Sequence, residues 1–208
     1  MDAALETSPQ SRWNNCYVWV VDRRCADHTR PDLVGSLHGQ VLEVNAGRGG
    51  ALDAYRTAAH VVAAEPVGAR RRRLLRHSRQ AAVPSTVIDA HAEQLPFPDA
   101  TFDAVVSILA LCRVKNQARA LAEIRRVLKP DGTLVFLEHV KTTKPWLMRA
   151  KKAGAPLMRR LAAGCRLNRD TVLAIRDAGF EFAILDFMEP APRIPVAGTL
   201  ARGRAYKP

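Results

Sequence analysis

Cysteine is scarce in this chain, which has 4 among 208 residues. The four thiols, Cys16, Cys25, Cys112 and Cys165, form no CxxC pair, and no histidine follows them at the spacing of a zinc finger. This pattern argues against a zinc site and against a disulfide framework. We therefore expect reduced thiols that are buried or half-buried, and no bound metal.

Long hydrophobic runs are missing as well. No uninterrupted apolar stretch approaches the roughly 20 residues that cross a bilayer. Residues 1–12 are polar and acidic, without the basic head and apolar stretch of a secretory signal. We expect a cytoplasmic protein, and its length suits a single domain with a full core.

Acidic residues are outnumbered, since 32 Lys and Arg against 20 Asp and Glu leave a formal net charge of +12. Such basicity is typical of proteins that bind nucleic acid, an anionic membrane or an anionic substrate. Most of the excess lies between Lys141 and Arg176, and a basic helical insertion is predicted at about 141–168. Its cationic face is either the solvated side of a lid helix or a peripheral contact with an anionic membrane. Nucleic acid is disfavoured, because no RNA-binding module accompanies the charge.

Short apolar runs alternate with helical patterns from residue 40 onward. Strands are predicted at 41–44, 61–64, 83–88, 104–109 and 133–137, and helices at about 51–59, 67–80 and 116–128. Apolar runs without alternation are typical of strands covered on both faces. The series predicts an α/β fold with a parallel sheet and helices on both sides. A helix at 170–178 and two strands at 180–188 and 197–206, which can form a hairpin, complete the chain.

A glycine-rich turn, E-V-N-A-G-R-G-G at 43–50, follows the first strand. Glycines let the backbone approach a ligand, and the N-terminus of a following helix offers free N–H groups. Glu65 ends the second strand about twenty residues further on, where an acid can bind both hydroxyls of a ribose. Turn and acid together favour an adenosine-containing ligand over a purely structural turn.

Four motifs occur in the order typical of class I S-adenosylmethionine-dependent methyltransferases. They are E-V-N-A-G-R-G at 43–49, A-A-E-P at 63–66, A-E-Q-L-P-F-P-D-A-T-F-D-A-V-V-S at 92–107 and E-I-R-R-V-L-K-P-D-G-T-L at 123–134. The chain resembles this class, and within it the branch of the ubiquinone/menaquinone C-methyltransferases. A closer resemblance, to bacterial relatives of the microsomal thiol methyltransferases, rests on L-C-R-V at 111–114, L-E-H-V at 137–140 and G-C-R-L-N-R-D-T at 164–171.

The resemblance implies a Rossmann-like fold whose seven-stranded sheet is mostly parallel, with one antiparallel strand. We expect an N-terminal helical cap at 1–34 and an S-adenosylmethionine-binding domain at 35–208. The implied cofactor contacts are Glu43, Gly47 and Gly49 at the methionine end, Glu65 at the ribose, His91, Ala92 and Glu93 at adenine, and Ser107 and Ile108 beneath the sulfonium, with Asn45, Ala46 and Pro66 as further cofactor-binding residues. Asn45 and His91 replace a usual Gly and a usual Asp. Asn tolerates positive φ best among residues with a side chain, so Asn45 can preserve the turn.

Methyl transfer to a thiol, phenol or enol requires the acceptor to lose a proton, so a base within reach helps. His139 is the first candidate, because the carboxyl ends of strands line the cleft in open α/β sheets. A structural histidine bonded to the backbone is the alternative. Glu138 is the second candidate, with capping or pairing with an Arg as its alternative.

Tyr17, Cys112 and Arg113 are predicted on the substrate side. Tyr17 belongs to an aromatic group with Trp13 and Trp19 that either covers the pocket or packs against the sheet edge. The resemblance implies methylation of a small, lipophilic molecule such as a thiol or a phenol. The alternatives are a quinone, phospholipid or RNA methyltransferase, and a non-catalytic cofactor- or partner-binding domain.

Overall fold

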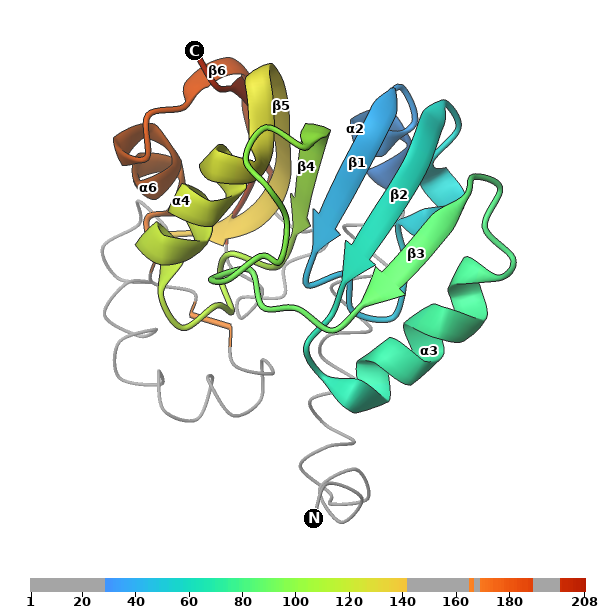
Figure 1. Ribbon diagram of the computed structural model, residues 1–208. Helices are drawn as coiled ribbons and strands as arrows, with labels where there is room; N and C mark the ends of the chain where they lie inside the picture. Colours follow the sequence, from blue (N-terminus) through green and yellow to red (C-terminus); the bar gives the residue numbers. More distant parts are fainter. Residues whose placement is uncertain (1–28, 142–164, 167–168, 189–198) are drawn as a thin grey trace, which may run out of the picture.

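Seven strands form a single sheet in the computed structural model, which describes residues 29–141, 165–166, 169–188 and 199–208. The strand order is β3-β2-β1-β4-β5-β7-β6 (Figure 1). The strands are β1 (Gly39–Val44), β2 (Ala58–Ala64), β3 (Ser85–Ile88), β4 (Phe102–Ile108), β5 (Leu128–Val140), β6 (Glu181–Met188) and β7 (Thr199–Tyr206).

Strands β1 to β5 pair in parallel, whereas β7 runs antiparallel to both of its neighbours. This confirms the predicted Rossmann-like fold with one antiparallel strand. The final two strands, β6 and β7, pair with each other through seven residue pairs, with a register shift between Phe182 and Ile184.

The described helices cover both faces of the sheet. They are α2 (Arg30–Val34), the 3₁₀ turn η3 (Leu52–Ala54), α3 (Gly68–Ser78), α4 (Gln117–Val127) and α6 (Thr171–Asp177). Leu33 of α2, Leu52 of η3 and Leu74 of α3 belong to one buried cluster with β1 and β2. Leu121 of α4 and Ile175 of α6 belong to a second cluster on the opposite face.

Local capping explains where two of these helices begin. The Asn116 side chain accepts the Arg119 N–H at 3.0 Å, and Asp170 accepts the Leu173 N–H at 3.1 Å. Each acceptor satisfies an N–H that the helix itself leaves unpaired. Gly179, with a φ of 83°, ends α6 as the sequence predicts.

The predicted helix at 51–59 is wrong. The chain forms only η3 there, and β2 already begins at Ala58. The apolar spacing of Ala51, Leu52, Ala54 and Tyr55 suggests a helical face, and all four side chains are indeed buried. They pack through a single short turn, because few residues separate the glycine turn from β2.

The sheet order reverses direction between β1 and β4, since the chain runs from β1 outward to β3 and then returns to β4 on the other side. In open α/β sheets, ligands bind at such a switch point, outside the carboxyl ends of the strands. Residues 45–50, 65–67 and 109–113 follow β1, β2 and β4 at this edge, which is the lower edge of the sheet in Figure 1.

Of the predicted N-terminal cap, the structure describes only residues 29–34, which include α2. Residues 142–164 and 167–168 of the basic insertion predicted at about 141–168 lie outside the described residues, as does the aromatic group containing Tyr17. Among the described helices, none is long and apolar enough to cross a membrane.

Candidate cofactor and substrate site

The glycine-rich turn adopts left-handed backbone conformations at three positions. Asn45, Gly47 and Gly49 have φ values of 50°, 64° and 90°. The positive φ of Asn45 confirms that asparagine preserves the turn in place of glycine. The Ala46 N–H donates to the Ala64 carbonyl at 3.0 Å, which ties the turn to the end of β2.

Gly47 and Gly49 have different roles in this turn. A Cβ at Gly49 would lie 2.9 Å from Leu74 Cδ1, so glycine there lets the turn pack against α3. Among the described residues, a Cβ at Gly47 would meet only the Asn45 carbonyl oxygen, at 3.9 Å. The described part of the chain therefore leaves space beside the Gly47 backbone.

The Glu65 carboxylate is held at the end of β2 by two backbone donors. Its Oε2 accepts the Gly47 N–H at 2.8 Å and its Oε1 accepts the Val67 N–H at 2.9 Å. A carboxylate has about four acceptor positions, so two remain for hydroxyl donors such as those of a ribose. Asn45 Oδ1 lies on the same turn, buried and without a hydrogen-bond partner in the part of the chain that the structure describes. Buried polar atoms are rarely left unpaired, so this oxygen fits a ligand that donates a hydrogen bond, such as an amine.

Glu43, predicted at the methionine end, is buried near the end of β1. The Tyr55 hydroxyl donates to its Oε2 at 3.2 Å. Burial, followed by the Glu43 charge, raises the pKa of Tyr55 well above its ordinary value, so the phenol stays protonated and remains a donor. Tyr55 thus holds the Glu43 carboxylate in place through this hydrogen bond, a role that the sequence motifs did not reveal.

The loop predicted to contact adenine is positioned by α4. Arg126 donates to the carbonyls of Leu95 and Phe97 and binds both oxygens of Glu123, at distances of 2.8–3.0 Å. Glu123 in turn accepts the Leu95 N–H at 2.8 Å. The E-I-R-R motif therefore shapes the L-P-F-P-D motif, which explains physically why both occur in one chain.

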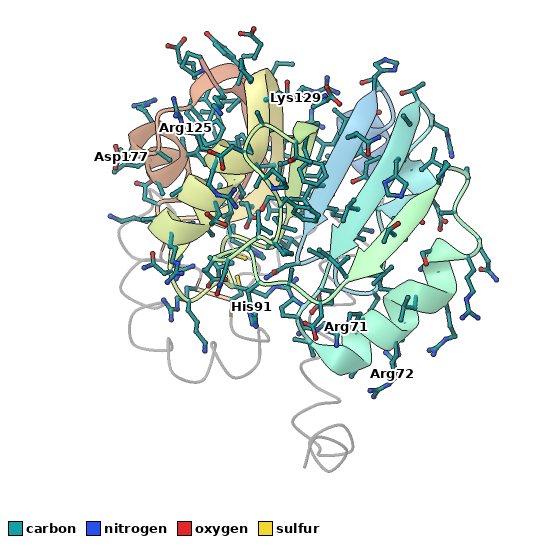
Figure 2. The ribbon with its side chains drawn as sticks, viewed as in Figure 1. Arg71, Arg72, His91, Arg125, Lys129 and Asp177 are labelled. Carbon is teal, nitrogen blue, oxygen red and sulfur yellow. The ribbon has the colours of Figure 1, made fainter. Side chains whose placement is uncertain are left out.

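The predicted adenine contacts lie in different surroundings. Ala92 is buried, whereas the His91 side chain is exposed at the carboxyl edge of the sheet, at the opposite end from Lys129 (Figure 2). The Glu93 carboxylate accepts the N–H groups of Lys115 and Asn116, at 2.7 and 3.3 Å. Glu93 thus connects this loop to the start of α4.

Glu138 has a positioning role that differs from the predicted catalytic one. Its carboxylate is fully buried and accepts four hydrogen bonds. The donors are the Ser107 hydroxyl and the N–H groups of Ala110, Leu111 and Cys112, at 2.8–3.0 Å. Burial raises the pKa of Glu138, and these donors oppose that rise. A carboxylate so occupied holds the chain after β4 in place, and the geometry argues against its acting as a base.

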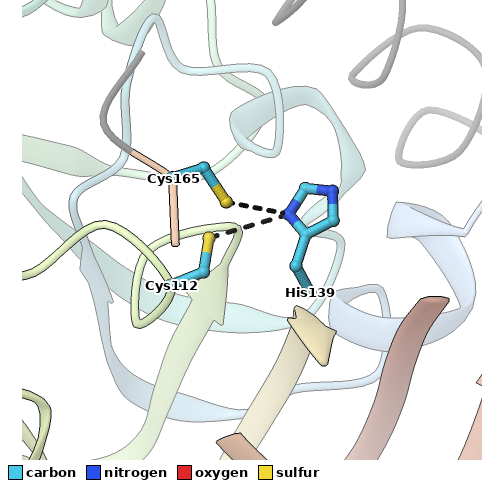
Figure 3. A group of neighbouring side chains, drawn as sticks. All are labelled: Cys112, His139 and Cys165. Carbon is cyan, nitrogen blue, oxygen red and sulfur yellow. Dashed lines mark hydrogen bonds between the residues drawn. The ribbon is translucent and has the colours of Figure 1, made fainter. Parts of the chain in front are cut away.

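His139 lies beside two cysteines. Cys165 Sγ is 3.3 Å and Cys112 Sγ is 3.7 Å from His139 Nδ1, and all three side chains are buried (Figure 3). His139 Nε2, on the other side of the ring, is buried without a hydrogen-bond partner among the described residues. We refer to Cys112, His139 and Cys165 as the thiol–imidazole cluster. Both thiols are free, as predicted, but no sequence spacing indicated that they meet.

The two thiols of the cluster differ in acidity. Burial, followed by hydrogen bonding to Cys165, raises the pKa of Cys112 well above its ordinary value. The hydrogen bond with Cys112, aided by the His139 charge, lowers the pKa of Cys165 well below its ordinary value. One proton shared between two adjacent sulfurs accounts for the opposite directions. Cys165 is therefore the more acidic of the two thiols.

The structure describes all of the remaining predicted residues except Tyr17. Ile108 is buried at the end of β4, and Arg113 Nε donates to the Leu109 carbonyl at 2.7 Å. Pro66 separates Glu65 from the start of α3. Tyr17 lies outside the described residues, so its substrate contact stays a prediction.

Comparison with known proteins finds similarity to methyltransferases. Residues 42–136 match the family model described as a methyltransferase domain. The chain is 29% identical to human thiol S-methyltransferase TMT1A over 170 residues, which cover 80% of this chain and 68% of that protein. Identity to human thiol S-methyltransferase TMT1B is 32% over 110 residues, and the chain spans less than half of that relative, 45% of its length.

A second group of relatives shares a shorter segment. The ubiquinone/menaquinone biosynthesis C-methyltransferase UbiE of Cupriavidus taiwanensis is 36% identical over 99 residues, which cover 41% of each chain. Two solved structures share the fold. A methyltransferase from Thermotoga maritima has a TM-score of 0.67 at 20% identity, covering 96% of this chain and 97% of that one. A geranyl diphosphate methyltransferase in complex with S-adenosylmethionine has a TM-score of 0.68 at 15% identity, covering 100% and 95%.

Motif order, sheet topology and these matches agree. Residues 42–136 match a methyltransferase domain, and these matches together with the fold support a class I S-adenosylmethionine-dependent methyltransferase. Within that class, the relatives named above are thiol S-methyltransferases and quinone C-methyltransferases.

Proposed function

We propose that this protein transfers a methyl group from S-adenosylmethionine to the thiol of a small, lipophilic molecule. The proposal rests on the observation that the glycine turn and the thiol–imidazole cluster lie at the same edge of the sheet. Gly47 follows β1, and Glu65, which accepts its N–H, follows β2. In the thiol–imidazole cluster, Cys112 follows β4 and His139 lies near the end of β5, so both sites flank the switch point of the sheet. The cofactor, when bound, supplies a methyl group on a sulfonium, and the chain positions donor and acceptor.

The cofactor-binding roles follow from the contacts of the turn. Glu65 has acceptor capacity left for ribose hydroxyls, and Gly47 leaves room for the methionine portion. Asn45 Oδ1 can accept a hydrogen bond from the cofactor's amine. Ala92, in the loop shaped by Arg126, flanks the adenine. Ser107 is turned toward Glu138, so its part is to hold the end of β4 in place.

Two independent observations favour a thiol as the acceptor. The similarity to human thiol S-methyltransferase TMT1A extends over 80% of this chain, whereas that to the UbiE of Cupriavidus taiwanensis covers 41%. The thiol–imidazole cluster also provides a buried setting in which an acceptor sulfur can lose its proton. We assign His139 as the base that receives this proton when nothing else is bound to the cluster.

A panel of acceptors tests the proposal. Purified protein is incubated with S-adenosylmethionine and one of three matched lipophilic acceptors: an alkyl thiol, a phenol or a quinol. Release of S-adenosylhomocysteine is measured, and the product is identified by mass spectrometry. We expect the methyl thioether as the main product, and no turnover by Glu65→Ala. A protein that methylates the quinol or the phenol at least as fast as the thiol would overturn the assignment.

A quinol is the second candidate, favoured by one specific observation. Hydrogenovibrio crunogenus UbiE is 50% identical to this chain over 60 residues, a higher local identity than to the thiol enzymes. That segment covers 29% of this chain, which restricts the argument to a part of the domain. The same panel decides between the two acceptors.

Peripheral contact with an anionic membrane is a further proposal about how a lipophilic acceptor arrives. It rests on the basic composition of residues 141–168, most of which lie outside the described residues. Co-sedimentation with vesicles of phosphatidylserine and phosphatidylcholine tests it. We expect binding that rises with the anionic fraction and falls with salt. Equal binding to neutral vesicles would remove the proposal.

A further inference from the structure

The thiol–imidazole cluster offers more than a base. Each of its residues provides one donor atom, and these three atoms lie within 4.8 Å of one another. Two sulfurs and one imidazole nitrogen form a donor set that suits Zn²⁺. All three side chains are buried, with exposed fractions of 1–5%.

The distances match those of a tetrahedral zinc site. An ion about 2.3 Å from sulfur and about 2.0–2.1 Å from nitrogen holds the two donor atoms roughly 3.5 Å apart. The observed separations from His139 Nδ1 are 3.3 Å to Cys165 Sγ and 3.7 Å to Cys112 Sγ. Both lie within about 0.2 Å of that spacing, so an ion requires little movement of the side chains.

Hydrogen bonds to other parts of the chain fix the backbone of Cys112, of His139 and of the residue that follows Cys165. The Cys112 N–H donates to Glu138 Oε2 at 3.0 Å, and the Cys112 carbonyl accepts the Arg166 N–H at 3.0 Å. The second of these bonds connects Arg166, which follows Cys165, to Cys112. The His139 carbonyl accepts the Thr171 hydroxyl at 3.2 Å. The ligands of metal sites are commonly oriented by such supporting contacts.

Charge balance favours occupation of this buried place. Two thiolates and Zn²⁺ sum to zero, and a neutral imidazole leaves that sum unchanged. An uncharged site avoids the large cost of burying an isolated charge. Three protein ligands leave one position of a tetrahedron open, as in zinc sites that bind a substrate or water.

We propose that Cys112, His139 and Cys165 bind one Zn²⁺, whose fourth position takes the sulfur of the acceptor thiol. This step rests on the proposed function. On binding, the S–H bond of the acceptor breaks, its proton passes to solvent, and its sulfur bonds to the ion as a thiolate. The sulfur then attacks the methyl carbon, the carbon–sulfonium bond breaks, and the thioether leaves together with neutral S-adenosylhomocysteine. In this form His139 is a ligand, and the ion takes over the task assigned above to a base.

Metal content tests the site without any assay of turnover. The full-length protein is stripped with a chelator under reducing conditions, reconstituted with Zn²⁺ and freed of excess metal. Elemental analysis should then find about one zinc per chain, falling to about a tenth or less in Cys112→Ser, Cys165→Ser and His139→Gln, because each loses a ligand. His60→Gln is the matched control and should retain the ion, since His60 bonds to Thr86 on β3. Circular dichroism compares the folding of each variant.

Cobalt spectra of the wild-type protein keep the test decisive even if the variants fail to fold. Co²⁺ should produce thiolate-to-metal charge-transfer bands, and an added alkyl thiol should shift them as it enters the fourth position. Absence of bound zinc and of these bands would overturn the site. Bands that the thiol leaves unchanged would overturn the acceptor's coordination. Unchanged thiol methylation by the metal-free protein would overturn the inference while leaving the proposed function intact.

Discussion

Glu65 Oε2 accepts the Gly47 N–H at 2.8 Å, which makes the acid at the end of β2 part of the glycine turn that follows β1. The same carboxylate therefore shapes the backbone and has acceptors left for a ribose. Glu65→Ala should weaken the binding of S-adenosylhomocysteine at least ~30-fold, about 2 kcal/mol, because both functions are lost together. Isothermal titration calorimetry measures the change.

The matched control for this variant is Glu181→Ala, which removes an exposed acid from β6. Its affinity should equal that of the wild type. If Glu65→Ala binds as tightly as this control, Glu65 does not contact the ribose.

Asn45 has a φ of 50°, a conformation that favours glycine and is costly for alanine. Asn45→Ala should be less stable than Asn45→Gly by about 1 kcal/mol, because only the alanine variant has a Cβ in the left-handed region. Both variants lack the buried Oδ1, so their difference isolates backbone strain. Urea unfolding at neutral pH measures it. Equal stability of the two variants would show that the turn adopts another conformation.

Glu138 accepts four hydrogen bonds in a fully buried place. Glu138→Ala should lower the free energy of unfolding by about 3 kcal/mol, because several buried N–H groups lose their acceptor at once. The Cys112 thiol should also react faster with a thiol reagent in the folded protein, since its backbone is no longer held. Asp186→Ala, an exposed site on β6, is the control for both measurements. An unaltered labelling rate would contradict the positioning role.

Glu123 links the stability of the adenine loop to pH. The hydrogen bond from Arg126 lowers the pKa of Glu123 below its ordinary value. A depressed carboxyl pKa contributes stability above the unfolded-state pKa of about 4.3, and this contribution is lost as pH falls through the folded-state pKa. Glu123→Gln should therefore be less stable than the wild type at pH 7 by about 1 kcal/mol, a modest value because the pair is partly exposed.

Urea unfolding of Glu123→Gln and wild type between pH 7 and acid conditions tests the sign. The difference in stability should shrink steadily below about pH 4.3. A difference that grows toward acid pH would contradict the assigned direction.

Local sequence patterns predict most of the sheet and of the cofactor turn. Apolar runs without alternation locate β1 to β5, and asparagine at position 45 is read correctly as a residue that tolerates positive φ. The short turn η3 is missed, because the burial of Leu52 and Tyr55 gives the same spacing as a helical face. Periodicity reports which side chains are buried, and the space available between neighbouring elements decides the conformation.

The thiol–imidazole cluster could not be predicted from spacing. Its members are 26 and 27 residues apart in sequence and meet because β4 pairs with β5 and residue 166 bonds to residue 112. The role of Glu138 was also hidden, since a buried acid beside a histidine resembles a catalytic pair. Only the directions of the two side chains separate them: Glu138 binds the backbone after β4, and His139 faces the two sulfurs.

The most direct test of the account is the product formed from a lipophilic thiol and isotopically labelled S-adenosylmethionine. The account predicts a labelled methyl thioether, formed in step with S-adenosylhomocysteine by the wild type and absent with Glu65→Ala. Cofactor binding with no labelled thioether, or label found on a quinol carbon in preference to sulfur, would contradict it.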